Sequence, residues 1–133
     1  MTNQKRSVQI RSQADIHNAV HAISAYANEI GMSTGSSAAI ATAVSELVTN
    51  VVKYAHAGRM SFHSKNRLAQ PGIEIVIEDS GPGIADLDHA MSDNVSTGGT
   101  LGLGLPGAKR LVDEFEISSK PKVGTRIRIV KWG

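Results

Sequence analysis

The sequence predicts an α+β fold: a two-layer α/β sandwich in which helices cover one face of a mixed, mostly antiparallel sheet. The first observation behind this prediction is that apolar residues recur at helical spacing in two stretches near the N-terminus. The second is that the strands expected further on come in pairs, each pair joined by a turn. Strands joined in this way run antiparallel, and we expect the helices to gather on one side of the sheet.

The N-terminal part is expected to form one short strand and two helices. Residues 7–10 include two β-branched apolar residues, which favours an edge strand. The first helix ends at Gly31, and its apolar residues alternate at spacings of four and three: Ile16, Val20, Ile23, Ala27 and Ile30. The second helix ends near residues 55–58, and its apolar residues are Ile40, Val44, Leu47, Val48 and Val51.

The rest of the chain is predicted to contain two pairs of strands with a loop and a helix between them. The first pair, residues 60–65 and 73–78, is joined by a polar connection over residues 66–72. A long loop follows over residues 83–100, with a short helix around residues 86–91, and its length is typical of a lid that closes over a ligand. The last elements are a helix over residues 105–115 and strands over residues 116–119 and 125–130, joined by a turn over residues 120–124.

Composition limits the class of protein. A chain of 133 residues with 41% apolar and 20% charged residues is expected to form one folded domain spanning residues 1–133. The net charge is only +2 and the basic residues are scattered, so no nucleic-acid partner is expected. No stretch approaches the roughly 20 apolar residues of a membrane span. The absence of cysteine suits the reducing cytoplasm. We therefore expect a cytoplasmic domain without a membrane partner.

A polar stripe follows the second expected helix. At about 100° per residue, Glu46, Asn50 and Lys53 fall close together beside the apolar face. A carboxylate can accept a proton, an amide oxygen can ligate Mg²⁺, and an ammonium group can offset phosphate charge. The alternative is a solvated helix edge without a chemical role.

Asp79 stands at the end of an expected strand and begins the motif Asp79-x-Gly81-x-Gly83. The strand delivers the aspartate into a turn in which we expect only glycine to tolerate the backbone angles. A carboxylate in this position can accept a hydrogen bond from an exocyclic amine such as that of adenine. The alternative is a plain turn, because Asp and Gly are ordinary turn residues.

A second glycine-rich stretch, Gly102-Leu103-Gly104-Leu105, precedes a helix whose first turn contains Pro106. Glycines in front of a helix N-terminus leave backbone N–H groups available for phosphate oxygens. The stretch fits neither the Walker pattern nor the dinucleotide fingerprint. The alternative is a flexible hinge.

Gly124-Thr125 opens the last expected strand, where the Thr125 hydroxyl is in reach of a water or of the Asp79 carboxylate if the two strands are neighbours. The alternative is an ordinary β-branched residue after a turn glycine. Taken in order, four motifs resemble the sequence boxes of the GHKL ATP-binding superfamily, whose fold is the Bergerat fold. They are Glu46-x-x-x-Asn50, Asp79-x-Gly81-x-Gly83, Gly102-x-Gly104 and Gly124-Thr125.

The resemblance implies a pocket for ATP and Mg²⁺. It matches Glu46 to the general base, Asn50 to the Mg²⁺ ligand and Asp79 to the adenine contact. The other nucleotide-binding positions that it implies are Lys53, Tyr54, Gly81, Gly83, Ile84, Gly102, Leu103, Gly104, Leu105 and Thr125.

Residues 44–50 and 104–115, together with Lys131-Trp132, are most similar to the switch kinases of the stressosome, which are small protein serine/threonine kinases. This likeness implies phosphorylation of STAS-domain scaffold or antagonist proteins. Activation of a downstream PP2C-type phosphatase and control of a sigma factor would follow. Two alternatives stay open: an anti-sigma factor with serine kinase activity, and a nucleotide-responsive interaction module without catalysis.

Overall fold

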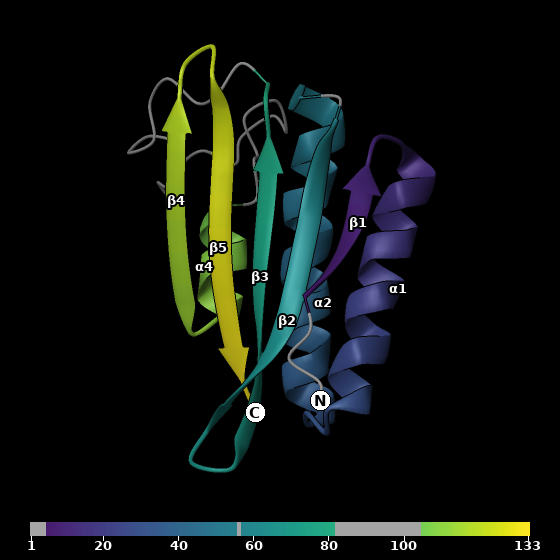
Figure 1. The fold of residues 1–133 in the computed structure, drawn as a ribbon, viewed down its shortest axis with the longest axis vertical. Coiled ribbons are helices and arrows are strands. Elements are labelled where there is room, and N and C mark those ends of the chain that lie inside the picture. The colour runs from purple at the N-terminus through teal and green to yellow at the C-terminus, as the bar shows by residue number, and fades with distance from the viewer. Residues whose placement is uncertain (1–4, 56, 82–104) are drawn as a thin grey trace.

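The computed structural model describes residues 5–55, 57–81 and 105–133 of the chain. They form two layers, with helices covering one face of a five-stranded sheet (Figure 1). The α+β two-layer sandwich predicted from the sequence is therefore confirmed. None of the helices in these residues is long and apolar enough to span a membrane.

Helices α1 (Gln13–Glu29) and α2 (Thr34–Asn50) begin at serine caps. The Ser12 hydroxyl oxygen accepts the Asp15 backbone N–H at 3.3 Å, and the Ser33 hydroxyl oxygen accepts the Ser36 N–H at 3.2 Å. Such caps satisfy N–H groups that have no partner within the helix. Gly31 has φ +88°, which is the left-handed backbone that ends a helix, as the sequence predicted.

The end of the second helix differs from a regular α-helix. After Asn50 the chain continues as a π-helical turn, η1 (Val51–Ala55). The last residue of η1, Ala55, agrees with the predicted end of the helix near residues 55–58. The change in winding was not predicted, and single π-helical turns are frequent at functional sites.

The sheet contains five strands among the described residues: β1 (Arg6–Ile10), β2 (Gly58–Arg67), β3 (Gln70–Asp79), β4 (Glu114–Lys120) and β5 (Gly124–Trp132). Their spatial order is β1-β2-β3-β5-β4, and each neighbouring pair is antiparallel. The short strand expected at residues 7–10 lies at one edge, as predicted.

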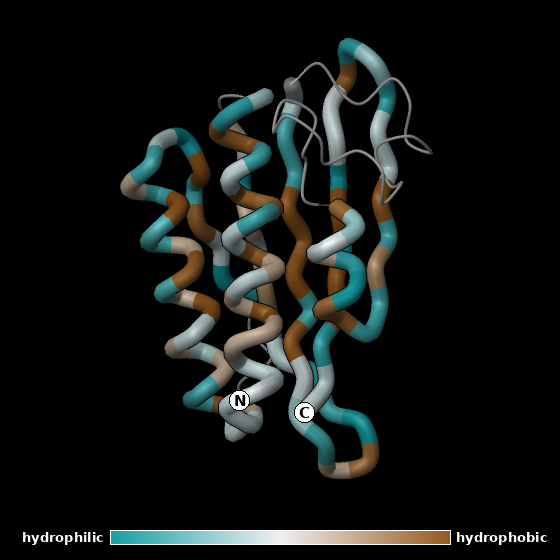
Figure 2. Tube along the Cα trace, turned by 180° about the vertical axis from the view of Figure 1, so that it is seen from behind, coloured by the Kyte–Doolittle hydropathy of each residue, from teal (hydrophilic) through white to brown (hydrophobic). Residues whose placement is uncertain are grey.

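The core lies between the sheet and the helices. Alternate residues of the central strands face the helices, among them Ile75 and Ile77 of β3 and Ile127 and Ile129 of β5. Figure 2, seen from the helix side, shows hydrophobic and hydrophilic residues alternating along α1 and α2. This is the pattern of helices with one buried face.

The connection between β2 and β3 is shorter than predicted. Instead of a polar segment over residues 66–72, the strands run on to a two-residue turn formed by Leu68 and Ala69. Both residues have positive φ, 49° and 68°, as a type I′ turn requires. The usual Asn-Gly signal of such a turn is missing, so the turn could not be recognised from the sequence.

The helix expected over residues 105–115 is also shorter. Helix α4 (Leu105–Leu111) ends four residues earlier than expected, and β4 starts at Glu114. Asp113 binds the chain to β5 at this point: its N–H donates to the Val130 carbonyl at 2.8 Å, and its carboxylate accepts the Trp132 N–H at 2.7 Å. These contacts to a distant strand override the helical periodicity.

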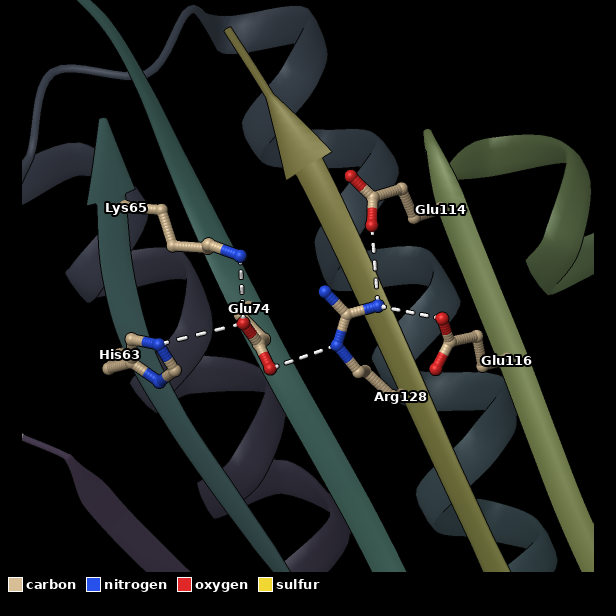
Figure 3. A network of polar contacts seen from close by, with 6 residues as sticks. All are labelled: His63, Lys65, Glu74, Glu114, Glu116 and Arg128. Carbon is tan, nitrogen blue, oxygen red and sulfur yellow. Dashed lines mark hydrogen bonds and ion pairs between the residues drawn. The ribbon is translucent and has the colours of Figure 1, made fainter. Parts of the chain in front are cut away.

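The open face of the sheet carries a network of ion pairs (Figure 3). Glu74 lies at its centre, 3.1 Å from Lys65 Nζ and 3.0 Å from Arg128 Nε. Burial disfavours the ionised carboxylate, but hydrogen bonds from Lys65 and Arg128 outweigh it and lower the pKa of Glu74 below 4.5. The full network consists of His63, Lys65, Glu74, Glu114, Glu116 and Arg128.

Candidate functional site

A row of three polar residues crosses one end of the sheet. Asp79 ends β3 and pairs with Thr125 of β5, and Thr125 pairs in turn with Ser119 of β4. Residues directly opposite each other share a face, and so do residues two apart along a strand. The side chains of the polar row therefore lie on the same face of the sheet as Ile77 and Ile127, which is the face that the helices cover. In Figure 1 this is the end towards which the arrows of β3 and β4 point.

The Asp79 carboxylate is fixed by its own turn. Its Oδ1 accepts the backbone N–H of Gly81 at 2.9 Å. Such a bond is typical of an aspartate that shapes the turn after it. A carboxylate accepts several hydrogen bonds, so this one orients the group and leaves capacity for a ligand.

Gly81 is required for a reason other than the one predicted. We expected backbone angles that only glycine tolerates, but Gly81 does not have a left-handed φ. Space is the reason: a Cβ on Gly81 would lie 2.5 Å from Ala55 Cβ and 2.8 Å from Ala55 Cα. The turn after Asp79 therefore packs directly against the π-helical turn η1.

Glycine is required at position 124 both for its backbone angle and for lack of space. Its φ is +141°, and a Cβ there would collide with the carbonyl oxygen of Asp79. Because Gly124 has no side chain, the start of β5 can lie in contact with the backbone at the end of β3. Thr125 is thereby held opposite Asp79, so β3 and β5 are the neighbouring strands that a contact between these two side chains requires.

Gly58 is a further positioning residue that the sequence analysis missed. It pairs with Asp79 from the β2 side, and a Cβ on it would lie 2.5 Å from the Glu78 carbonyl oxygen and 2.8 Å from Val51 Cγ1. A glycine immediately before an apolar strand was the available signal. Gly58 and Gly81 together allow η1 to pack against the end of β3.

The polar stripe of the second helix is only partly retained. Glu46 is exposed one turn before the half-buried Asn50, which is the last residue of α2. Lys53 lies in the π-helical turn, so it does not continue the α-helical stripe. Its Nζ is 5.4 Å from the centroid of the Tyr54 ring, a cation–π arrangement on the same turn.

Leu105 is described, and its side chain is buried in the core at the start of α4. Any nucleotide contact of Leu105 would therefore come from its backbone. The other predicted glycine-loop residues, together with the predicted lid over residues 83–100 and the helix around residues 86–91, lie outside the described residues. These glycine-loop residues are Gly83, Ile84, Gly102, Leu103 and Gly104.

In the described ranges, no three His, Cys, Asp or Glu side chains gather as metal ligands. The predicted Mg²⁺ ligand is of another kind, the side-chain amide of Asn50. Mg²⁺ is commonly held by one or two protein oxygens, with substrate phosphates and water as its remaining ligands. A single amide oxygen at the end of α2 fits that mode of binding.

Comparison with known proteins identifies the family. Residues 11–131 match the family described as the histidine kinase-like ATPase domain, and the chain belongs to this family. Among solved structures, the catalytic domain of histidine kinase ThkA in a nucleotide-free form has a similar fold. The TM-score is 0.56 with 12% sequence identity, over 95% of each chain.

Two groups of curated relatives are similar over most of their length. The serine/threonine-protein kinase RsbT of Bacillus subtilis strain 168 is 41% identical over 130 residues, which cover 98% of each chain. The anti-sigma F factor of Thermoanaerobacter sp. strain X514 is 30% identical over 114 residues, which cover 83% of this chain and 80% of the relative. The chain is thus a protein serine/threonine kinase of the histidine kinase-like ATPase family, and the resemblance and enzyme class predicted from the sequence are confirmed.

Proposed function

We propose that this chain transfers phosphate from ATP, with Mg²⁺, to a serine or threonine of a STAS-domain protein, and that it works in the cytoplasm as a partner-switching regulator. The proposal includes a downstream PP2C-type phosphatase that the kinase activates after leaving its substrate. The observation that carries it is the polar row at the end of the sheet, in a chain 41% identical to a serine/threonine kinase.

The row has the chemistry of an adenine contact. Asp79 offers an oriented carboxylate, and Thr125 offers a hydroxyl from the neighbouring strand. Both can accept a hydrogen bond from an exocyclic amine. The close packing of Gly81 on Ala55 keeps this end of the sheet against the end of α2, where Asn50 and Glu46 lie.

In this proposal Asn50 would ligate Mg²⁺, and the ion would offset the charge of the phosphates. The Glu46 carboxylate is exposed and would accept the proton of the attacking substrate hydroxyl. Lys53 and Tyr54, which follow on η1, would lie alongside the nucleotide. The glycine loop around Gly102 and Gly104 would supply backbone N–H groups to the phosphates.

Calorimetric titration tests the nucleotide site. Asp79→Asn keeps the shape of the side chain but alters its hydrogen bonding, and we expect ATP affinity to fall by roughly 10-fold or more. Glu78→Gln is the matched control, because Glu78 is the neighbouring carboxylate on the opposite face of the same strand. Equal affinity in wild type and Asp79→Asn would remove Asp79 from the pocket.

Phosphate transfer tests the substrate class. The wild-type chain should label a STAS-domain protein from γ-labelled ATP, and the Glu46→Gln variant should do so roughly 10²–10⁴-fold more slowly. The relationship to anti-sigma F factors supports a second candidate, an anti-sigma factor with serine kinase activity. Stable binding of a sigma factor, competing with the phosphorylation substrate, would favour that candidate. ATP binding without transfer to any STAS-domain protein would leave a non-catalytic interaction module.

A further inference from the structure

Ser119 is the outer member of the polar row and was not among the predicted site residues. Its Oγ lies 2.8 Å from Thr125 Oγ1 across the β4–β5 pair and 3.2 Å from the carbonyl oxygen of Gly124. The side chain is half-buried on the helix side of the sheet. It lies behind Thr125 as seen from Asp79, because β5 separates β4 from β3.

These two contacts assign the direction of the hydrogen bonds. A hydroxyl has one proton and two lone pairs, whereas a carbonyl oxygen can only accept. The Ser119 hydroxyl therefore donates to the Gly124 carbonyl, and it accepts the proton of Thr125. A Thr125 hydroxyl held in this way has used its proton and keeps both lone pairs for other groups at the end of the sheet.

We propose that Ser119 is a positioning residue that fixes Thr125 as a hydrogen-bond acceptor and thereby selects a nucleotide base with an amino group. This inference rests on the proposed function, in which the base lies against Asp79 and Thr125. With Thr125 in this state, the pocket presents two acceptors side by side, the Asp79 carboxylate and the Thr125 oxygen.

The consequence is discrimination at position 6 of a purine. Adenine carries an amino group there, with two hydrogens that two acceptors can receive. Hypoxanthine carries a carbonyl oxygen at the same position, which would face two acceptors and no donor. Sites built from fixed hydrogen-bonding groups reject such mismatched analogues strongly, because buried polar groups are left unpaired.

The test compares ATP with inosine triphosphate (ITP) in the Ser119→Ala variant of the full chain. Without Ser119, the Thr125 hydroxyl is free to rotate and to donate to the carbonyl oxygen of hypoxanthine. We expect the ratio of kcat/KM for ATP to that for ITP to fall by roughly 5- to 10-fold, the effect of one hydrogen bond. Most of the change should appear as a lower KM for ITP, with kcat for ATP little altered.

Two further variants separate positioning from general structural support. Ser119→Thr keeps the hydroxyl and should retain the wild-type ratio, whereas Ser118→Ala alters an exposed neighbour of the same strand and should change nothing. Calorimetric affinities for ATP and ITP, measured without substrate protein, provide a second readout that does not depend on catalysis. Thermal melting of each variant checks that it is folded.

The outcomes of this experiment are distinct. A ratio in Ser119→Ala within twofold of wild type would overturn the inference and leave the proposed function intact. An equal loss of affinity for both nucleotides would also overturn it, because Ser119 would then support the fold instead of choosing the base. If the wild type binds and uses neither nucleotide, the proposed function itself fails.

Discussion

Replacing Gly81 by alanine should disturb the candidate site through a single added methyl group. The new Cβ would lie 2.5 Å from Ala55 Cβ and 2.8 Å from Ala55 Cα, and neither atom belongs to a flexible side chain. Carbon atoms in contact are about 3.5–4.0 Å apart, so the turn after Asp79 and the π-helical turn must separate by about 1 Å. Overpacking of this kind lowers the free energy of unfolding by about 1–3 kcal/mol.

The effect on catalysis should be comparable in free energy to the effect on stability. Asp79 Oδ1 accepts the N–H of Gly81, so a shift of Gly81 moves the carboxylate as well. A shift of about 1 Å in a residue that positions the substrate can cost roughly 100-fold in rate, even when it lies away from the reacting atoms. We therefore expect kcat/KM for ATP to fall between about 10- and 100-fold, at a temperature where urea unfolding shows the variant to be folded.

Gly35→Ala is the matched control, because Gly35 lies in the first turn of α2 and a Cβ there would have no heavy atom within 4 Å. That variant should gain about 0.5–1 kcal/mol of stability, as alanine restricts the unfolded chain, and should keep full activity. Wild-type stability and activity in Gly81→Ala would refute the reasoning, since the contact with Ala55 would then be easily relieved.

Three further predictions concern other parts of the molecule. Glu46→Gln should bind ATP nearly as wild type does while phosphate transfer falls by roughly 10²–10⁴-fold; loss of ATP binding in calorimetry would indicate a structural role instead. The double replacement Leu68→Asn with Ala69→Gly suits the positive φ of both residues and should raise the free energy of unfolding by about 1 kcal/mol in urea, whereas a decrease would show that the turn is not strained. Glu74→Gln should lose about 1–2 kcal/mol at pH 7 through its contacts with two cations. The pKa of Glu74 is lowered in the folded chain, so its contribution is present above the pKa of the unfolded carboxyl and is lost progressively as the pH falls through the lowered pKa of the folded state. The unfolding curves of this variant and wild type should therefore converge in acid. A difference that stays constant as the pH falls would show that the two cations do not act on the ionised carboxylate.

Much of the fold could be predicted because it depends on local patterns. The spacing of apolar residues such as Ile16 and Ile23 predicts an amphipathic helix whatever lies around it, and Gly31 ends that helix by its own backbone preference. Asp79 was predicted to end a strand for the same reason: an apolar run stops and turn residues begin. The two wrong boundaries, at residues 66–72 and 105–115, fall where contacts between distant strands or an unusual turn outweigh local preference.

The chain by itself thus determined the elements, the family resemblance and the choice of Asp79 and Thr125 as site residues. Only the tertiary structure decided what holds those residues in place. Position 81 requires glycine because η1 packs against it, and position 58 requires glycine because β3 and Val51 leave no space for a Cβ. Ser119 lies behind Thr125 because β4 pairs with β5. Each of these contacts depends on how separate elements meet, and close packing and hydrogen-bond direction between such elements leave no periodic trace in the chain.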